Sequence, residues 1–171
     1  IRDENLAGIN VTVPFKKLII PFLDDLDSTA EETKSVNTIF KVNNKIVGFN
    51  TDKAGFALTI WDLYPVKDIG IINNLEKKTV FILGAGGVTA SIISAFQHDE
   101  TRIFLSNRTK ENANELKKNF PKLEILDWGQ RPSNFDIAIN TTSIGLEANE
   151  RISLDFSDCD KDKNKLFYDL I

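Results

Sequence analysis

Two polar segments of this sequence carry the residue types that a proton transfer needs. Lys16 ends the segment Asn10-Val11-Thr12-Val13-Pro14-Phe15-Lys16, and Asp52 ends the segment Asn50-Thr51-Asp52. A positioned ammonium can donate a proton to a developing alkoxide, and a carboxylate can hold that ammonium in place. A glycine-rich turn, Gly84-Ala85-Gly86-Gly87, follows later in the chain. This combination predicts proton transfer coupled to hydride transfer, the chemistry of a nicotinamide-dependent dehydrogenase.

The glycine-rich turn lies between an apolar run at 79–83 and a helix-compatible run at 88–96. Glycine permits a tight turn and a close approach of the backbone to a pyrophosphate, and the helix N-terminus adds N–H donors. Thr89 occupies the position where this pattern usually has a third small residue. A tight strand–helix connection without a ligand is the alternative. The order of strand, turn, helix and second strand favours a nucleotide site that includes Gly84, Ala85, Gly86, Gly87 and Val88.

The end of the second strand indicates which nicotinamide cofactor is bound. About 20 residues after the glycines, an acidic residue would hold the ribose 2′-hydroxyl of NAD. The segment there is Ser106-Asn107-Arg108-Thr109-Lys110, which has no carboxylate. Arg108 and Lys110 would attract a 2′-phosphate, and Thr109 could add a hydroxyl donor. These residues favour NADP as the cofactor. The alternative is that Arg108 is an exposed arginine at a strand end with no role in binding.

Hydrophobic patterning predicts the elements that position the first group of residues. We expect a strand at 8–13, helices at 15–23 and 29–36, a hairpin of strands 38–42 and 45–49, and a helix from Lys53. Pro14 would occupy the first position of its helix, and Ser28 would cap the next one. Asp52 would cap the last helix, whose apolar face would use Phe56, Ile60 and Leu63 until Pro65 ends it.

The second part of the chain alternates apolar strands with helical segments. We expect strands at 79–83, 102–106, 123–126, 136–139 and 166–170, with helices from Gly87 and over 110–120. This alternation predicts an α/β fold with a doubly wound parallel, Rossmann-like sheet that binds NADP, preceded by part of an open α/β substrate domain. The predicted division is a partial substrate-binding and catalytic domain at 1–53, a connecting helix and loop at 54–77, and a dinucleotide-binding domain at 78–171.

Composition excludes several classes of function. The net charge of −4 implies no general affinity for nucleic acid. The single cysteine, Cys159, precludes an intrachain disulfide and a cysteine-rich metal site, and it fits a reducing, cytoplasmic compartment. The single histidine, His98, argues against a His-based zinc site and a Ser/His/Asp triad. No apolar run approaches the roughly 20 residues that span a membrane. We expect a small-molecule substrate, no metal and a homodimeric assembly.

The two ends of the sequence also carry an expectation. The chain begins Ile1-Arg2-Asp3 and contains no methionine. It ends on a strand-like run, Phe167-Tyr168-Asp169-Leu170-Ile171. We therefore expect an internal fragment of a longer protein.

Six short motifs follow one another along nearly the whole chain. They are Asn-Val-Thr-Val-Pro-Phe-Lys (10–16), Ser-Val-Asn-Thr (35–38), Gly-Phe-Asn-Thr-Asp (48–52), Gly-Ala-Gly-Gly (84–87), Asn-Arg-Thr (107–109) and Asn-Thr-Thr-Ser-Ile-Gly (140–145). Each is modest alone, but together they resemble the shikimate dehydrogenase family of aromatic amino acid biosynthesis. The resemblance implies NADP-dependent, reversible reduction of 3-dehydroshikimate to shikimate, a step toward chorismate.

The resemblance also implies a role for each motif. Lys16 and Asp52 would be the catalytic pair, and Thr12 and Asn37 would join them in binding substrate hydroxyls. The 2′-phosphate site would be Asn107, Arg108 and Thr109, and the loop of Thr141, Thr142 and Ser143 would lie near the nicotinamide. From the residues alone, Lys16 could also be a solvated lysine, Asp52 an ordinary helix cap, and Asn37 a turn residue.

This chain departs from the family in ways that leave two rival functions. The family's Ser-x-Ser carboxylate site would lie upstream of Ile1, and a Tyr and a Gln would lie downstream of Ile171. Asn112 lies where another basic residue is frequent, with Lys110 nearby, and Leu146 replaces a common Met. One rival is an NAD-dependent quinate/shikimate dehydrogenase, which an Asp after the second strand would favour. The other is a non-catalytic nucleotide- or metabolite-binding paralogue.

Overall fold

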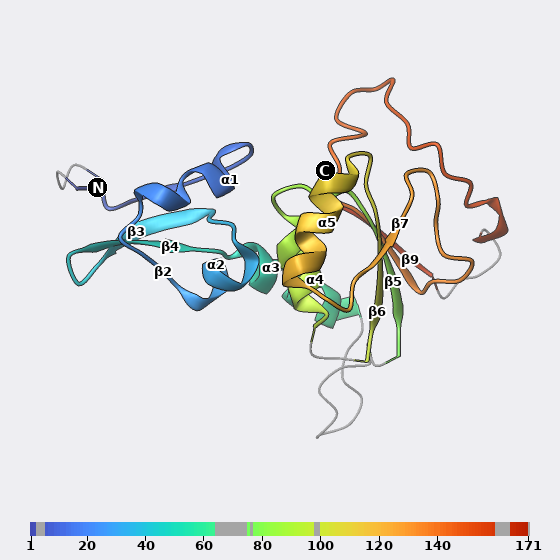
Figure 1. Cartoon of the computed structure of the whole chain (residues 1–171), viewed down its shortest axis with the longest axis horizontal. Coiled ribbons are helices and arrows are strands. Elements are labelled where there is room, and N and C mark those ends of the chain that lie inside the picture. The colour runs from blue at the N-terminus through green and yellow to red at the C-terminus, as the bar shows by residue number, and fades with distance from the viewer. Residues whose placement is uncertain (3–5, 64–74, 76, 98–99, 160–164, 171) are drawn as a thin grey trace.

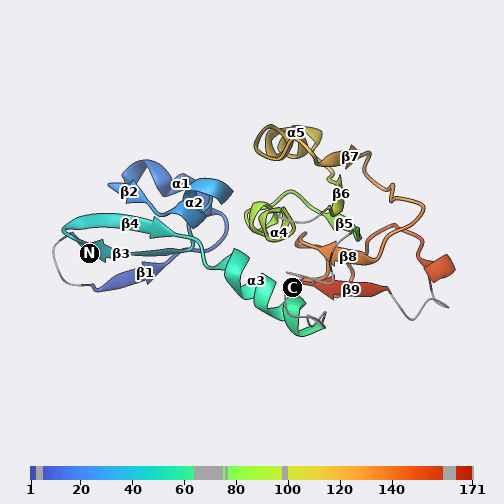
Figure 2. The same ribbon diagram turned by 90° about the horizontal axis from the view of Figure 1, so that it is seen from below.

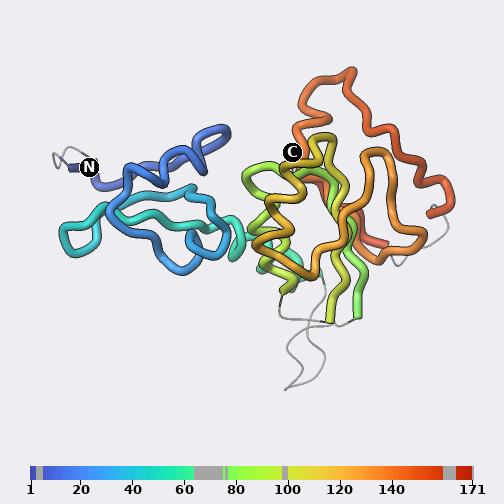
Figure 3. The backbone as a smooth tube through the Cα atoms, viewed as in Figure 1, coloured from blue at the N-terminus to red at the C-terminus, as the bar shows by residue number. Residues whose placement is uncertain are grey.

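The computed structural model describes residues 1–2, 6–63, 75, 77–97, 100–159 and 165–170. Two β-sheets lie side by side, and helix α3 (Asp52–Leu63) connects them (Figures 1 and 3). The expected boundary loop at 65–77 falls mostly outside the described residues, as does His98. Within the described part, no three His, Cys, Asp or Glu side chains gather as metal ligands would. No helix in that part is long and apolar enough to cross a membrane.

The first sheet has four strands in the order β1-β3-β4-β2. Its strands are β1 (Gly8–Asn10), β2 (Asp25–Leu26), β3 (Thr38–Val42) and β4 (Lys45–Phe49). The predicted β3–β4 hairpin is confirmed. Asn43 and Asn44 have φ values of 47° and 65°, the left-handed conformations that such a turn requires and that asparagine tolerates. Strand β1 is shorter than predicted, because residues 11–14 leave the sheet to enter the next helix.

Two helices of this part differ from their predictions at their ends. The expected helix at 15–23 is α1 (Phe15–Leu18) followed by a 3-10 turn, η1 (Ile20–Phe22), because Pro21 has no N–H to continue an α-helix. Helix α2 (Ser28–Thr33) is capped by Asp27, not Ser28. The Asp27 carboxylate accepts hydrogen bonds from the N–H groups of Thr29 and Ala30. This helix ends early because Lys34 is left-handed, with a φ of 49°.

Helix α3 begins at Asp52, but Asp52 is not its cap. Asn50 Oδ1 instead accepts a hydrogen bond from the Asp52 N–H at 3.0 Å. Phe56 and Ile60 are buried as predicted, whereas Leu63 is 52% exposed. Leu63 is the last residue of the helix and extends past the core. The Asp52 carboxylate is thereby available for contacts other than capping.

The second sheet has five parallel strands in the order β7-β6-β5-β8-β9. Its strands are β5 (Thr79–Leu83), β6 (Arg102–Ser106), β7 (Glu124–Leu126), β8 (Ile137–Asn140) and β9 (Leu166–Asp169). Each lies within a residue or so of its predicted range. The order reverses between β5 and β8, which is the switch point where this architecture binds ligands. The expected Rossmann-like α/β fold is confirmed.

Helices cover one face of this sheet. Helices α4 (Thr89–Ala95) and α5 (Lys110–Asn119) lie on the same side as α3 (Figure 2). Their apolar residues share one core with inward residues of β5, β6 and β8. On the opposite face, Phe81 and Phe135 pack against partly buried apolar residues of 152–156 and against Cys159, in the short turn η2 (Ser157–Cys159). Both faces are covered, so strands β5 and β8 are held rigidly where their carboxyl ends meet.

Candidate functional site

Three of the predicted substrate-site residues form one hydrogen-bonded cluster. Lys16 Nζ donates to Asp52 Oδ2 at 2.7 Å, and Asn37 Nδ2 donates to Asp52 Oδ1 at 2.8 Å. The Lys16 and Asp52 side chains are 12% and 20% exposed. Both carboxylate oxygens therefore have a donor. The ammonium and the carboxylate form a partly buried ion pair whose charges balance. Such a pair can hold a proton donor in one place while a reactant approaches it.

The backbone around these residues explains why they meet. The Lys16 carbonyl accepts a hydrogen bond from Val36 N at 2.9 Å, which fixes α1 beside the start of β3. Asn37 N donates to Phe49 O at 3.0 Å, so Asn37 lies opposite the end of β4. Asp52 follows β4 after the two residues Asn50 and Thr51, at the first position of α3. Three separate segments thus deliver one side chain each to the same point.

Thr12 takes no part in the hydrogen bonds of this cluster, although the N–H of its neighbour Val11 donates to Asn37 O at 2.8 Å. The Thr12 carbonyl accepts from Phe15 N at 2.8 Å. Its side chain borders a shallow apolar groove whose other lining residues are Asn10, Val11, Phe15, Leu18, Ile19 and Phe22. The side chain is exposed, which leaves its hydroxyl open to solvent.

Gly84 adopts a backbone conformation that only glycine takes readily. Its φ is +102°, and an added Cβ would lie 2.7 Å from Thr141 Oγ1 and 2.9 Å from Thr142 N. Any side chain would therefore be strained and would collide with the loop after β8. The turn after β5 and the loop after β8 are in direct contact at the switch point, as a shared ligand site requires.

Thr89 accounts for the departure from the glycine pattern. It is fully buried, and its Oγ1 donates to Gly84 O at 3.2 Å and lies 2.9 Å from Thr141 Oγ1. Thr141 Oγ1 in turn lies 2.8 Å from Leu83 O. Threonine therefore fits at this position, because its hydroxyl group forms a hydrogen bond to the glycine-rich turn. A glycine here would leave room for the turn but could not form this bond.

A cleft of about 470 Å³ opens over this switch point. It is lined by Val13, Gly84, Ala85, Gly86, Gly87, Val88, Asn107, Arg108, Thr109, Asn112, Trp128, Thr141, Thr142, Ser143, Ile144 and Glu150. Every residue predicted for the cofactor lines it except Lys110. The structure therefore brings the three predicted segments, 84–88, 107–109 and 141–143, into one cavity.

The segment after β6 is tied to the glycine-rich turn. Asn107 Oδ1 accepts from Ala85 N at 3.0 Å, and Asn107 Nδ2 donates to Thr109 O at 2.6 Å. Arg108 is exposed beside them at the rim of the cleft. Lys110, by contrast, pairs with Asp127 at 3.1 Å, with both side chains 67% exposed. The arginine is the cation of this segment that lines the cleft.

The loop after β8 is ordered by its own polar side chains. Asn140 Oδ1 accepts from Thr142 N at 3.0 Å and from Thr142 Oγ1 at 2.7 Å. Thr141 is buried against the glycine-rich turn, whereas Ser143 is exposed in the cleft. Of the three predicted residues, Ser143 presents its side chain most openly and Thr141 acts through the turn that it supports.

The lysine cluster and the nucleotide cleft are adjacent. A Cβ added to Gly87 would lie 3.6 Å from Lys16 Cδ, which is ordinary van der Waals contact. Val13 lines the cleft from the same side. Lys16 therefore runs along the glycine-rich turn with its ammonium next to Asp52. A group bound in the cleft near Gly87 would lie close to the proton-carrying pair.

Comparison with known families is consistent with this geometry. The sequence profile of the shikimate dehydrogenase substrate binding domain matches residues 1–39. The profile described as shikimate / quinate 5-dehydrogenase matches residues 68–170. This chain belongs to the shikimate/quinate dehydrogenase family.

Individual relatives within the family are similar over the whole chain. A shikimate dehydrogenase (NADP(+)) of Pelagibacter ubique is 48% identical over 100% of this chain and 61% of the relative. The protein of the same name from Aquifex aeolicus is 39% identical over 97% of this chain and 54% of the relative. The chain thus spans between half and two thirds of the length of these curated relatives.

Solved structures of the family share the fold. The crystal structure of shikimate dehydrogenase from Aquifex aeolicus superposes with a TM-score of 0.80 at 32% identity, over 98% of this chain and 67% of that one. A shikimate dehydrogenase in complex with NADP+ superposes with a TM-score of 0.81 at 25% identity, over 99% and 59% of the two chains. These superpositions cover both sheets of the present structure.

Sequence reasoning missed several residues that line the cleft or support the lysine cluster. Trp128 lines the cleft just after β7 and is 38% exposed. An aromatic residue at the carboxyl end of a strand was the available signal for it. Asn50 lay inside the recognised Asn-Thr-Asp motif, but its capping role needs the fold to be seen. Ile144 lay inside the Asn-Thr-Thr-Ser-Ile-Gly motif without being assigned to the cofactor, and Glu150 enters the cleft from beyond that motif, where no local pattern marks it.

Proposed function

We propose that this protein is an NADP-dependent shikimate dehydrogenase that interconverts 3-dehydroshikimate and shikimate. The observation that carries the proposal is the Lys16–Asp52 pair lying against Gly87 at the edge of the nucleotide cleft. Family membership supports the same assignment, as do the printed names of the two relatives. A proton carrier next to a cofactor cleft is what ketone reduction needs.

Lys16 is the proposed proton donor to the substrate oxygen. Reduction of a ring ketone leaves a developing alkoxide, which a positioned ammonium stabilises and protonates. In the reverse direction, the neutral amine accepts the hydroxyl proton. Asp52 holds the ammonium at 2.7 Å, and Asn37 holds the second carboxylate oxygen at 2.8 Å. Asn37 thus prevents the carboxylate from rotating away from the lysine.

The substrate is a polyol, and neutral groups around the pair suit its hydroxyls. We propose that Thr12 and Asn37 bind them together with Lys16 and Asp52. The exposed Thr12 hydroxyl can donate and accept. Asn37 already donates to Asp52 and Thr51, so a substrate hydroxyl would share or replace one of these bonds.

The cleft residues fit NADP. Gly84, with its positive φ, makes the tight turn at the switch point, and residues 84–88 line the cavity of about 470 Å³. Arg108 suits a 2′-phosphate, with Asn107 and Thr109 as neutral partners. We place Thr141, Thr142 and Ser143 near the nicotinamide end and Lys110 at the periphery. When bound, the nicotinamide supplies or accepts the hydride.

The same support extends to organisation and location. We propose a substrate-binding part at 1–53, a connecting helix and loop at 54–77 and a dinucleotide-binding part at 78–171. The single cysteine fits a cytoplasmic enzyme. We also propose that the protein forms a homodimer, which sedimentation equilibrium would test.

The decisive experiment offers shikimate and quinate in parallel to the protein encoded by the complete open reading frame, with NADP and with NAD. We expect reduction of NADP with shikimate to be the most efficient pairing. Efficient turnover of quinate with NAD would instead establish the quinate/shikimate dehydrogenase alternative. Tight binding of NADP without turnover of either substrate would indicate a non-catalytic paralogue.

A further inference from the structure

Asn50 is a buried amide that joins the two sheets at the catalytic pair. Its exposure is 2%, and its side chain makes three hydrogen bonds. Oδ1 accepts from Asp52 N at 3.0 Å and from Ser91 Oγ at 3.1 Å, and Nδ2 donates to Ser35 O at 2.9 Å. Because the Asp52 N–H needs an acceptor and the Ser35 carbonyl needs a donor, only one orientation of the amide satisfies all three partners.

These partners belong to three different parts of the site. Asp52 carries the proposed catalytic carboxylate. Ser91 lies on α4, the helix that follows the glycine-rich turn, and is fully buried. Ser35 is also fully buried, and its own Oγ donates to Gly87 O at 3.0 Å. Asn50 is therefore one bond from the carboxylate's backbone, one from α4, and two from the glycine-rich turn itself.

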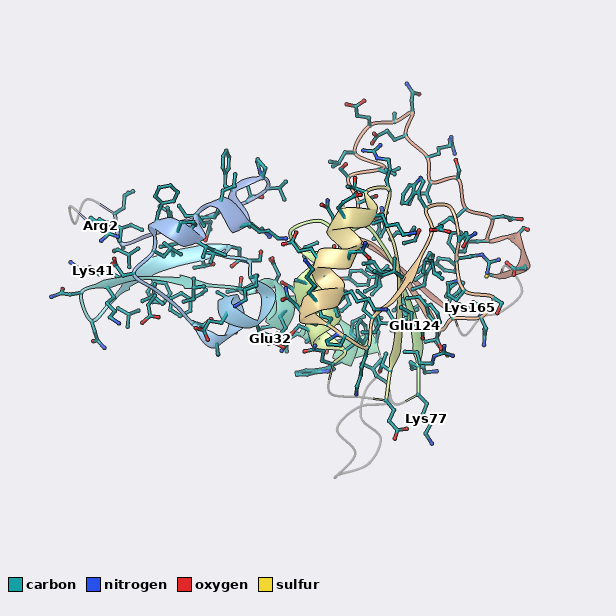
Figure 4. All side chains as sticks on the ribbon, viewed as in Figure 1. Arg2, Glu32, Lys41, Lys77, Glu124 and Lys165 are labelled. Carbon is teal, nitrogen blue, oxygen red and sulfur yellow. The ribbon has the colours of Figure 1, made fainter. Side chains whose placement is uncertain are left out.

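A second link between the sheets runs through Glu32 and bypasses Asn50. Glu32 lies between the two halves of the molecule (Figure 4). Its carboxylate accepts from Lys53 Nζ at 2.7 Å and from Ser94 Oγ at 2.6 Å. Ser91 and Ser94 are thus two buried serines of one helix that both bond the opposite half. Only Ser91 does so through the residue that caps Asp52, which makes Ser94 a matched control.

We propose that Asn50 is a positioning residue that fixes Asp52 against Lys16 and holds α4 in register with that pair. The inference rests on the proposed function in taking Lys16 and Asp52 as the catalytic pair. Without the amide, the first turn of α3 would lose its cap, and Ser91 and Ser35 would each lose a buried partner. A displacement of about 1 Å at a reacting group can lower a rate by roughly 10²-fold.

The first test is a kinetic comparison of Asn50→Ala, Asn50→Ser and Ser91→Ala in the protein encoded by the complete open reading frame. We expect Asn50→Ala to lower kcat for shikimate oxidation by about 10- to 100-fold while the Kd for NADP changes little. Serine can still accept from the N–H two residues on, so Asn50→Ser should recover part of kcat. Ser91→Ala should lower kcat moderately, and Ser94→Ala should leave it unchanged.

The second test needs no turnover. Lys16 is shielded by its partner, so its acetylation by an N-hydroxysuccinimide ester, followed by mass spectrometry, reports the Lys16–Asp52 contact. We expect Lys16 to be acetylated severalfold faster in the Asn50→Ala variant than in the wild type. The acetylation rate of the neighbouring Lys17 serves as an internal reference. If Asn50→Ala fails to fold, Asn50→Ser and Ser91→Ala carry the comparison.

The outcomes separate this inference from the proposed function. An inactive wild-type protein that still shows faster Lys16 acetylation in Asn50→Ala would remove the function and keep the positioning role. An active wild type whose Asn50 variants keep kcat and Lys16 acetylation, while losing only thermal stability, would overturn the positioning role. Equal losses of kcat in Ser91→Ala and Ser94→Ala would also overturn it, because general packing between the halves would then explain both.

Discussion

Lys16 and Asp52 lie 36 residues apart in the sequence and form a 2.7 Å ion pair at the edge of the nucleotide cleft. Their side chains are 12% and 20% exposed, so each charged group is neither fully solvated nor fully buried. Burying one such charge alone would be costly, whereas the pair is electrically balanced. The pair thus keeps an ammonium ready beside the cleft without requiring the rest of the site to neutralise it.

Replacing Lys16 with Ala should lower kcat by roughly 10²-fold or more, the scale of general acid–base catalysis. The substitution removes the proposed proton donor and leaves Asp52 bonded only by Asn37. Steady-state kinetics with shikimate and NADP measure the effect. Lys17→Ala is the matched control, because Lys17 is the adjacent lysine and makes only a 3.5 Å, exposed contact with Glu115. Wild-type turnover in Lys16→Ala would exclude the lysine from the mechanism.

Replacing Arg108 with Ala should weaken NADP much more than NAD. Arg108 lines the cleft, and a hydrogen bond to a charged group contributes about 1.5–3 kcal/mol, so the NADP affinity should fall by at least about tenfold. NAD lacks the 2′-phosphate and should be nearly unaffected. Binding titrations with both nucleotides provide the measurement, and equal losses would refute the 2′-phosphate role.

Lys110→Ala should affect NADP less than Arg108→Ala does. Lys110 is exposed, pairs with Asp127 and does not line the cleft. Its contribution should be a long-range attraction that salt screens. The same titrations at low and high ionic strength test this. A loss of NADP affinity as large as that of Arg108→Ala, and insensitive to salt, would place the lysine in the phosphate site after all.

Gly84→Ala should destabilise the fold, whereas Gly86→Ala should not. At Gly84 the φ of +102° and the 2.7 Å approach to Thr141 Oγ1 imply strain of about 1–3 kcal/mol or more. A Cβ on Gly86 would meet nothing closer than Thr141 O at 3.6 Å, so its effect on stability should stay within about 0.5 kcal/mol. Gly86→Ala should instead weaken NADP, since its backbone lines the cleft. Urea unfolding and nucleotide titration distinguish the two effects, and equal stabilities would contradict the steric argument.

Local patterns predicted the elements well where one physical signal dominated. The apolar run at 79–83 ends at glycines, and both observations agree on a buried strand and a turn. Asn43 and Asn44 marked the hairpin because asparagine tolerates positive φ. Asp27 and Ser28 are both good helix caps, so neighbouring residues competed and the cap was assigned one position late. Such competition is decided by tertiary contacts that the sequence does not display.

The site was predicted through its residue types, but not through its connections. Lys16 and Asp52 were chosen for their chemistry, and their 2.7 Å contact depends on how α1 docks against β3. The pairing of Lys110 with Asp127 was invisible because Lys110 begins α5 and Asp127 lies in the loop after β7, 17 residues later. Asn50 was recognised only as part of a sequence motif, and its role follows from three buried hydrogen bonds that the fold creates. Long-range hydrogen bonding is the part of the site that composition and spacing do not encode.

Asp136 should make the stability of the second sheet sensitive to acid. Burial raises the pKa of this carboxyl group, but hydrogen bonds from Thr79 N at 2.8 Å and Lys78 Nζ at 3.0 Å outweigh it. The net effect holds the pKa below the ordinary value of 3.8. A carboxylate with a lowered folded-state pKa contributes stability that is present above its unfolded-state pKa and is lost as the pH falls through the folded-state value.

Asp136→Asn should therefore lower the free energy of unfolding at pH 7, and its difference from wild type should shrink below about pH 4. The wild-type carboxylate joins the edge of β5 to β8 through two bonds, which the neutral amide would weaken or lose. Urea unfolding from pH 7 to pH 3 provides the comparison. Asp62→Asn, at an exposed position on α3, should stay within about 0.5 kcal/mol of wild type at pH 7. A stability difference between Asp136→Asn and wild type that is constant across this range would show that Asp136 does not couple protonation to folding.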